Sequence, residues 1–158
     1  MNFDEWVKAV PLTITGDPLW KVEAYRLGLF AADIGWHDVT RLMQDKRTLD
    51  LSDQLYRSLG SISANIADGY SKSTGKDRAR FYEYALGSAR ESRDWYYKSR
   101  YLLGEDVTNH RLNFMTQLVR LLVTMVPQQR TRGTIREDSS SYETDLDYLL
   151  NNIPLPEL

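Results

Sequence analysis

The side chains in this sequence that are best suited to chemistry are a series of cations with one tyrosine among them. Arginine and lysine neutralise phosphate groups, and a tyrosine ring can stack on a nucleic-acid base. The last four members recur at steps of 3, 4 and 3, which places them on one face of a helix. The pattern therefore predicts a surface that binds RNA or DNA. Its members, which we call the basic stripe, are Lys76, Arg80, Arg90, Arg93, Tyr97 and Arg100.

A solvated helix face without any ligand is the alternative interpretation of the basic stripe. Glu83 lies within it, and Asp94 can pair with Lys98 one turn later on the same helix. Outer helix faces normally carry charges of both signs. Assembly of several copies into a ring would favour binding, because the electrostatic fields of the copies add.

Patterns typical of catalysis or metal binding are few. The chain has no cysteine, which excludes disulfides, thiolate nucleophiles and cysteine-based zinc sites. Asp106 and His110 lie four residues apart and could share a metal, but a histidine near the start of a helix is more often an exposed surface residue. Gly69–Asp77 is one residue too long for a phosphate-binding loop and lacks its metal-binding Ser or Thr. We therefore predict no enzymatic activity, and no metal or cofactor.

The composition is that of a single domain without a membrane segment. The chain has 158 residues, of which 42% are hydrophobic and 27% are charged, as is ordinary for a globular protein. No apolar run approaches the roughly 18 residues that indicate a membrane span. The N-terminus carries acids rather than a basic leader. Together with the lack of cysteine, these features favour a cytoplasmic location.

Charge is distributed unevenly along the chain. The formal net charge is −2, from 20 basic and 22 acidic residues. Residues 134–158 hold one basic and six acidic residues, so residues 1–133 hold 19 basic and 16 acidic ones, a balance of +3. A basic body with an acidic tail is compatible with nucleic-acid binding or with contact between tail and body.

Apolar periodicity predicts four long helices joined by short loops. Asp17-Pro18 has the residue types preferred at the start of a helix, and Pro127 is expected to end the last one. Thr74 with Asp77 resembles a capping box, and Gly104 is expected to close the third helix. Because short connections make neighbouring helices antiparallel, the expected fold is an all-α, up-and-down four-helix bundle over residues 1–130.

The first long helix carries two apolar strips. One follows steps of 3 and 4 along the whole helix, and we expect this strip to face the core. The other would lie against a second subunit or simply widen the core-facing side. The first strip comprises Val22, Tyr25, Leu29, Ala32, Trp36, Val39 and Met43, and the second comprises Leu27, Phe30 and Ile34.

Small residues lie beside the apolar strip of the second helix. Glycine in a helix interior costs about 1 kcal/mol relative to alanine, so we expect a packing role for Gly60. Together with Ser63, Ala64 and Ala67, it would let another backbone approach closely, and this face also favours assembly of several copies. Gly69 is expected to end this helix near its C-cap.

Residues 131–158 are predicted to be a polar linker followed by an acidic amphipathic tail. Thr131–Ser141 is polar and rich in serine, and Ser140 with Glu143 resembles another capping box. A helix of about 12 residues is marginal alone in water, so we expect its apolar side to dock on the bundle and its acids to screen the basic stripe. A free tail that folds on a partner is the alternative. The apolar positions are Tyr142, Leu146, Leu149, Leu150 and Ile153.

Two segments resemble a known protein family. Ser63–Gly69 has the sequence Ser-Ala-Asn-Ile-Ala-Asp-Gly. It is similar to the S-x-N-I-A-E-G signature of the four-helix-bundle proteins encoded within intervening sequences of bacterial 23S rRNA genes, with Asp68 in place of the usual Glu. Phe81–Glu91 is similar to that family's F-x-x-x-A-x-G-S-x-x-E segment. The resemblance covers roughly residues 18–127, and the longer, more acidic tail departs from the family.

The resemblance implies a bundle that assembles as a homopentamer and has no established enzymatic activity. A related branch, the accessory proteins of diversity-generating retroelements, partners a reverse transcriptase and binds nucleic acid. Three polar motif residues, Asn65, Ser88 and Glu91, are expected to pair with one another across the second and third helices, because buried polar groups normally have partners. The motif positions with expected structural roles are Asn65, Gly69, Gly87, Ser88 and Glu91.

The sequence thus predicts a non-enzymatic, homo-oligomeric binding or scaffold protein. Its expected partner is RNA, DNA or a nucleic-acid enzyme such as a reverse transcriptase, bound through the basic stripe. The alternative is a protein–protein assembly module that recruits its partner through the acidic tail and binds no nucleic acid.

Overall fold

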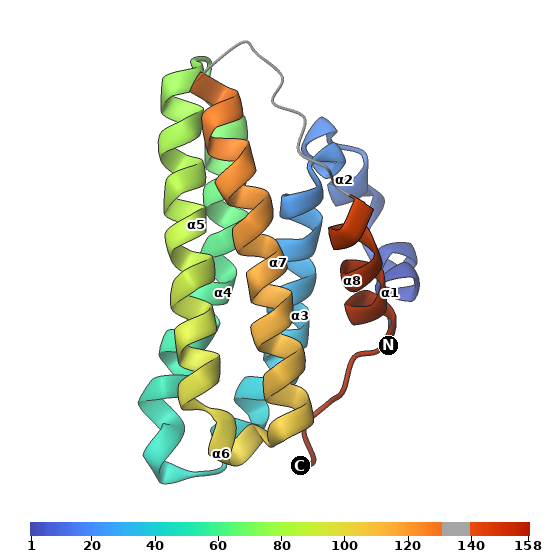
Figure 1. The fold of residues 1–158 in the computed structure, drawn as a ribbon, viewed down its shortest axis with the longest axis vertical. Coiled ribbons are helices and arrows are strands. Elements are labelled where there is room, and N and C mark those ends of the chain that lie inside the picture. The colour runs from blue at the N-terminus through green and yellow to red at the C-terminus, as the bar shows by residue number, and fades with distance from the viewer. Residues whose placement is uncertain (131–139) are drawn as a thin grey trace.

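Four long helices form the body of the molecule (Figure 1). The structure is a computed structural model that describes residues 1–130 and 140–158, with side chains in the second range described from Asp145 onward. Each long helix packs antiparallel against the next along the chain, which confirms the predicted all-α four-helix bundle. The four are α3 (Glu23–Leu42), α4 (Leu49–Tyr70), α5 (Gly75–Lys98) and α7 (Glu105–Arg130).

Short helical segments connect and cover the bundle. α8 (Ser140–Asn151) packs on α7, on the side away from α5 (Figure 1). Most of the predicted linker, residues 131–139, lies outside the described residues, as do the side chains of the predicted capping box at 140–143. Within the described ranges, no helix combines the length and hydropathy needed to cross a membrane. The other short segments are α1 (Phe3–Ala9), α2 (Leu12–Thr15), the 3-10 helices η1 (Pro18–Lys21) and η2 (Lys46–Thr48), and α6 (Arg100–Leu103).

The N-terminal helix α1, which the sequence analysis did not predict, is attached to α3 by the aromatic rings of Trp6 and Phe3. Asn2 caps α1, and its Oδ1 accepts a hydrogen bond from the backbone N–H of Glu5 at 2.9 Å. Trp6 is buried, and its Nε1 donates to Oδ2 of Asp33 at 2.5 Å. The ring centroid of Trp6 lies 5.1 Å from that of Phe30. These contacts extend the hydrophobic core to α1, a segment too short to show a repeating pattern of apolar residues in the sequence.

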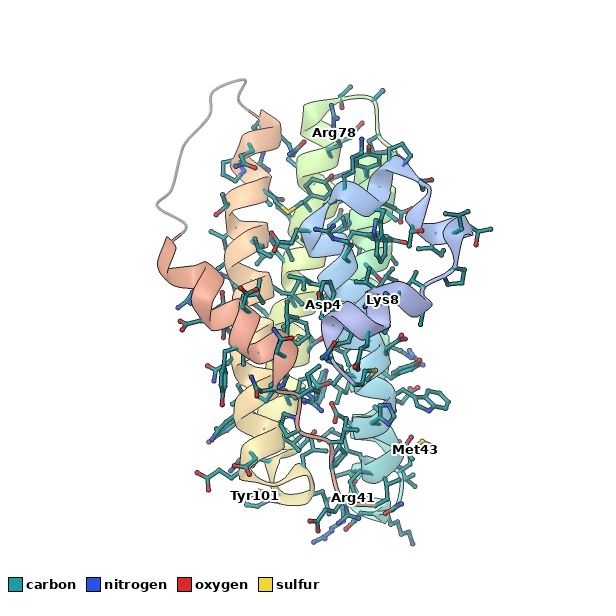
Figure 2. All side chains as sticks on the ribbon, turned by 90° about the vertical axis from the view of Figure 1, so that its right-hand side faces the viewer. Asp4, Lys8, Arg41, Met43, Arg78 and Tyr101 are labelled. Atoms are coloured by element: carbon teal, nitrogen blue, oxygen red, sulfur yellow. The ribbon has the colours of Figure 1, made fainter. Side chains whose placement is uncertain are left out.

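The strip of α3 that was predicted to face the core lies at its margin, with Val22, Tyr25 and Leu29 half-buried against the core. Only Val39 of its seven residues is buried, and Trp36 and Met43 are 59% and 60% exposed. Figure 2 shows Met43 projecting away from the bundle. A Cβ at Gly28 would lie 3.2 Å from a backbone nitrogen of α4, and one at Gly35 would lie 2.4 Å from a leucine of α4. The close approach of α4 buries the second strip, Leu27, Phe30 and Ile34, which therefore widens the core-facing side of α3, one of the two roles predicted for it.

Of the small residues of α4, Ser63 makes the predicted close contact, with its backbone nitrogen 3.2 Å from a Cβ built at Gly28 of α3, whereas Gly60 and Ala64 do not. Gly60 and Ala64 are exposed, and a Cβ added to Gly60 would meet nothing within 4 Å. Gly69 does lie in the last turn, but its role is packing, because a Cβ there would come 2.8 Å from the ring of Tyr82. The glycines of α3 supply the other side of the close α3–α4 contact.

The helix ends predicted from the sequence for the later helices differ in part from those in the structure. Gly104 was predicted to close the third helix, but α5 ends at Lys98 and Gly104 instead ends the short α6 that follows, with a φ of 81°, a left-handed conformation that favours glycine. Pro127 does not end α7, which continues to Arg130. That prediction was wrong. A proline removes only one backbone hydrogen-bond donor from a helix, and α7 tolerates this loss because it extends less than one turn beyond Pro127.

Candidate nucleic-acid interface

The basic stripe lies on the outer side of α5 and on the first residue of α6. The predicted capping box at the start of α5 is confirmed, since Oγ1 of Thr74 accepts from the backbone N–H of Asp77 at 3.2 Å. Small and aromatic residues of α5 face α4 and α7, which leaves the opposite side to the stripe. The buried residues of α5 are Ala79, Tyr82, Ala85, Ala89, Ser92 and Tyr96.

The beginning of the basic stripe shares its surroundings with acids. Lys76 and Arg80 are exposed, and the guanidinium of Arg80 lies 4.0 Å from the carboxylate of Asp77. Glu83, which interrupts the stripe in the sequence, forms an ion pair with Arg130 of α7. Exposed pairs of this kind contribute little to stability, but they lower the positive potential near the start of α5.

The two central arginines of the basic stripe have different surroundings. Arg90 is exposed and forms no hydrogen bond or ion pair with any residue that the structure describes. Arg93 is half-buried, and its Nη1 donates to Oγ1 of Thr116 at 3.2 Å. The charge of Arg90 is therefore fully available to a ligand, whereas Arg93 also connects α5 to α7.

The far end of the basic stripe combines a cation with exposed aromatic rings. The guanidinium carbon of Arg100 lies 4.2 Å from the ring centroid of Tyr97 and 4.3 Å from that of Tyr101. Arg100 Nη1 donates to the carbonyl oxygen of Tyr97 at 3.0 Å, and its Nη2 donates to the hydroxyl of Tyr101 at 2.8 Å. Tyr97 is 53% exposed and Tyr101 is 83% exposed. We call these three residues the tyrosine–arginine platform.

Tyr101 was not among the predicted site residues, although a sequence signal for it exists. It follows Tyr97 by four residues, which continues the helical spacing of the basic stripe. Figure 2 shows Tyr101 at the end of the bundle opposite Arg78. An exposed ring held by a neighbouring cation suits stacking on a planar group, because its orientation is already restricted.

Two polar residues of the family motif form hydrogen bonds within their own helices. Asn65 Nδ2 donates to the carbonyl oxygen of Ser61 at 2.8 Å. Trp95 Nε1 donates to Oε1 of Glu91 at 3.2 Å. Asn65 is half-buried and Glu91 is exposed, so neither needs a partner across the bundle. The predicted pairing of these residues with each other and with Ser88 was wrong.

Serines outside the predicted set make the polar link between α4 and α5. Ser92 Oγ donates to Ser58 Oγ at 2.8 Å, and both serines are buried. Ser88 contributes through its carbonyl oxygen, which also lies within hydrogen-bond distance of Ser92 Oγ at 2.8 Å. Gly87 is exposed, and a Cβ there would meet nothing within 4 Å. This face of the motif is therefore open to solvent in the single chain.

A buried polar cluster inside the bundle was missed by the sequence analysis. Arg111 of α7 forms a two-point ion pair with Asp38 of α3, with Nε–Oδ2 at 2.7 Å and Nη2–Oδ1 at 2.9 Å. Tyr96 of α5 donates its hydroxyl proton to the same Oδ2 at 2.8 Å. The partners are 73 and 58 residues apart in sequence, so no local pattern reveals them. With His110, these residues form what we call the core polar cluster.

His110 is buried in the core polar cluster, and its predicted exposure was wrong. Nη1 of Arg111 donates to Nδ1 of His110 at 2.8 Å, so the ring proton is on Nε2, which donates to the carbonyl oxygen of Leu149 at 2.7 Å. Burial lowers the pKa of His110 below its ordinary value, with the charge of Arg111 acting in the same direction. The imidazole is therefore neutral at pH 7, and both of its nitrogens are occupied by protein.

The core polar cluster holds the C-terminal segment on the bundle. Arg111 Nη2 also donates to the carbonyl oxygen of Pro154 at 2.9 Å. The predicted docking of the tail is thus confirmed for α8, with Leu146, Leu149 and Leu150 buried. The acids of the tail were also predicted to screen the basic stripe. α8 does not do this, because it lies on the side of α7 away from α5 (Figure 1). Among the described residues, no group of three or more potential ligands could hold a metal ion.

The fold and these sites define an all-α bundle of four long helices whose third helix carries an exposed series of cations and tyrosines. The sequence model of the 23S rRNA-intervening sequence protein family matches residues 29–124, and the chain belongs to this family.

One solved structure supports the fold. The crystal structure of a protein of unknown function from the S23 ribosomal protein family of Bacteroides thetaiotaomicron VPI-5482 is similar, with a TM-score of 0.62 and 21% sequence identity. The similarity covers 65% of this chain and 97% of that one. No match was found among curated proteins.

Proposed function

We propose that the protein is a non-enzymatic, homo-oligomeric binding protein that engages RNA or DNA through the outer side of α5. The observation that carries this proposal is the tyrosine–arginine platform, with Arg100 held against two exposed tyrosine rings. Single-stranded nucleic acid is bound by this combination, because cations neutralise phosphates while rings stack on bases without sequence preference. A nucleic-acid enzyme such as a reverse transcriptase is then the natural protein partner, since it would share the same strand.

The basic stripe adds a sequence-independent electrostatic contribution to the platform. Arg90 lies between the start of α5 and the platform with its charge unpaired by the described residues. In a single copy, Glu83, Glu91 and Asp94 offset much of this charge. A ring of five copies would repeat the platform around an axis and raise the affinity for a long strand, because one strand could contact several copies.

Salt-dependent binding tests this proposal. We expect fluorescence anisotropy to detect binding of labelled single-stranded RNA at about 50 mM salt. Changing Arg90 and Arg100 together to Gln should flatten the slope of log K against log salt by about 0.7 for each lost phosphate contact. The matched control changes Lys8 and Lys21 to Gln, which removes two exposed charges from other elements and should leave the slope unchanged. Absence of binding by the parent protein, or equal slopes for both variants, would overturn the proposal.

An exposed strip on α3 and α4 supports the homo-oligomeric part of the proposal. Trp36 and Tyr56 contact each other edge to face, with their ring centroids 5.9 Å apart, yet they remain 59% and 41% exposed. Tyr56, Gly60 and Ala64 follow at intervals of four on α4, so the aromatic pair borders a surface of small side chains. Small residues allow close approach of another helix, and exposed apolar strips mark interaction surfaces. A homopentamer, which the family resemblance suggests, would cover this strip.

Light scattering with a charge-insertion variant tests the assembly. The parent protein should have a mass near that of five chains, and Ala64→Arg should dissociate the assembly without unfolding the bundle, because Ala64 is exposed in the single chain. Asn113→Arg, at an exposed position of α7 and outside this strip, is the control and should leave the mass unchanged. A monomeric parent protein would contradict the assembly but not binding by a single copy.

The second candidate function is protein recruitment through the acidic side of α8. α8 presents Asp145, Asp147 and a 67% exposed Tyr148 to solvent while its leucines are buried. This surface suits a basic protein partner, and it requires no nucleic-acid binding. Asp145→Asn with Asp147→Asn should weaken such recruitment and change nucleic-acid affinity little, whereas the Arg90 and Arg100 variant should have the reverse effects.

A further inference from the structure

A pocket lies at the end of the bundle where α5 begins, far from the tyrosine–arginine platform. The start of α3, the end of α4, the first turns of α5 and the last turns of α7 surround it, and its volume is about 340 Å³. Figure 2 shows Arg78 at this end of the bundle, whereas Tyr101 lies at the other. The size is within the range of pockets that enclose small molecules.

Arg78 is the cation that lines this pocket, and its charge is not satisfied by the described residues. Its Nε is buried and has no hydrogen-bond partner there, and no described acid forms an ion pair with it. Two other arginines of α5 have partners, since Arg80 lies near Asp77 and Arg93 donates to Thr116, and Arg90 is exposed to solvent, whereas Arg78 has a buried Nε. A partly buried guanidinium without a partner is unfavourable, and an oxyanion ligand would remove that cost through paired charge-assisted hydrogen bonds.

Neutral donors and a helix terminus converge on the same pocket. Gln128 and Gln129 of α7 and Tyr70 and Tyr82 line it. Burial raises the pKa of Tyr82, with Arg78 acting in the opposite direction, so the phenol is protonated at pH 7 and able to donate. α3 also begins here, and no side chain caps its first amides. The start of a helix favours negative charge, which adds to the effect of the guanidinium.

The remaining lining residues limit the kind of anion that fits. Among the described residues, Glu23 is the one acid that lines the pocket, and its exposed side chain disfavours a ligand with several negative groups. Tyr70 is 38% exposed and offers a ring surface on which a planar group can pack. Leu121 and Met125 supply an apolar wall for the body of such a ligand.

We propose that this pocket binds a small planar molecule that carries a single oxyanion group, a carboxylate or a phosphate monoester, with Arg78 holding that group. The planar body packs on Tyr70 and the apolar wall, and the glutamines and Tyr82 donate to the remaining oxygens. Arg78 is not a member of the basic stripe, and the pocket lies at the opposite end of the bundle from the tyrosine–arginine platform, so the failure of this site and the failure of the platform are independent results.

Titration calorimetry with three probes tests the site. Adenosine monophosphate and benzoate represent the two oxyanion sources, and adenosine is the neutral counterpart of the first. We expect saturable binding of at least one anion and no binding of adenosine. Arg78→Gln should weaken that binding by about tenfold to a hundredfold, because it removes a charged hydrogen-bond donor. Lys98→Gln, on the same helix but outside both the pocket and the basic stripe, is the matched control and should bind like the parent protein.

The outcomes separate the ligand classes and can overturn the proposal. Binding of adenosine monophosphate alone identifies a phosphate site, and binding of benzoate alone identifies a carboxylate site. Shifts of the Gln128 and Gln129 side-chain amide resonances in the parent protein should accompany binding, and they keep the test decisive if Arg78→Gln fails to fold. The proposal is overturned if neither anion binds below about 10 mM, or if Arg78→Gln and the parent protein bind equally.

Discussion

The core polar cluster and the basic stripe contain the same kinds of side chain, arginine and tyrosine beside acids, but use them in opposite ways. Arg111 is fully buried, and all of its nitrogens are hydrogen-bonded to Asp38, His110 and Pro154. Arg90 is exposed and has no partner among the described residues. A saturated group stabilises the fold and has no capacity for a ligand, whereas an unsatisfied one contributes little to the fold and remains free to bind.

The largest expected effect on stability is at Arg111. Arg111→Met should lower the free energy of unfolding by about 3–5 kcal/mol, because it leaves the carboxylate of Asp38 buried without its charged partner. The same substitution at Arg90 should change stability by less than about 0.5 kcal/mol. Chemical denaturation of both variants measures the difference. If Arg111→Met costs no more than Arg90→Met, the contrast between the two regions is wrong.

The sequence predicts the basic stripe better than the core polar cluster because the residues of the stripe are close together in the sequence, whereas those of the cluster are far apart. All members of the stripe lie on one helix and the turn after it, so helical spacing alone places them together. Asp38 and Arg111 meet only after four helices have packed, and each resembles an ordinary surface charge in its own segment. The same limit explains α3, where periodicity identified two apolar strips but only the approach of α4 at Gly28 and Gly35 decides which one is buried.

Removing the C-terminal segment should have the next largest effect. A chain that ends at Arg130 loses the burial of Leu146, Leu149 and Leu150 and the carbonyl oxygens that His110 and Arg111 bind. We expect a loss of about 2 kcal/mol or more in stability, since the burial is only partly offset by the entropy gained on release. Nucleic-acid affinity should not change, because α8 lies on the side of α7 away from α5 (Figure 1).

Two measurements check the truncated chain. Thermal unfolding reports the stability, and Tyr148→Ala in the intact chain, at an exposed position of α8, serves as the control that should melt like the parent protein. Anisotropy with single-stranded RNA reports the affinity. Tighter binding by the truncated chain would show that the tail screens the basic stripe after all, despite the position of α8.

A smaller effect on stability is expected from acidification. Because burial lowers the pKa of His110 in the folded protein below 6.5, the unfolded chain takes up a proton more readily than the folded one. The free energy of unfolding should therefore fall as the pH drops through 6.5 and continue to fall until the folded pKa is reached. Protonation would also place a second cation beside Arg111.

Histidine variants separate this contribution from that of other groups. His110→Gln, whose amide can still donate to the carbonyl oxygen of Leu149, should flatten the pH dependence of the denaturation midpoint between about pH 7 and pH 5.5. His37→Gln, at an exposed position of α3, should retain the dependence of the parent protein. Equal profiles for the two variants would mean that His110 does not control this transition.

The smallest effect on stability is expected at the tyrosine–arginine platform. Substitutions there should weaken nucleic-acid binding without changing its salt dependence. Tyr97→Leu and Tyr101→Leu should each change the free energy of unfolding by less than about 0.5 kcal/mol, since both rings are exposed. Each should nevertheless weaken single-stranded RNA binding by about 1–3 kcal/mol, because a base loses its stacking partner. The salt slope should not move, because no phosphate contact is lost.

Arg90→Gln should instead lower that slope by about 0.7 while leaving the affinity extrapolated to high salt nearly unchanged. If the tyrosine variants alter only the slope, or if they destabilise the fold as Arg111→Met does, the platform is a structural element, and the division between a saturated core and an unsatisfied surface does not apply to it.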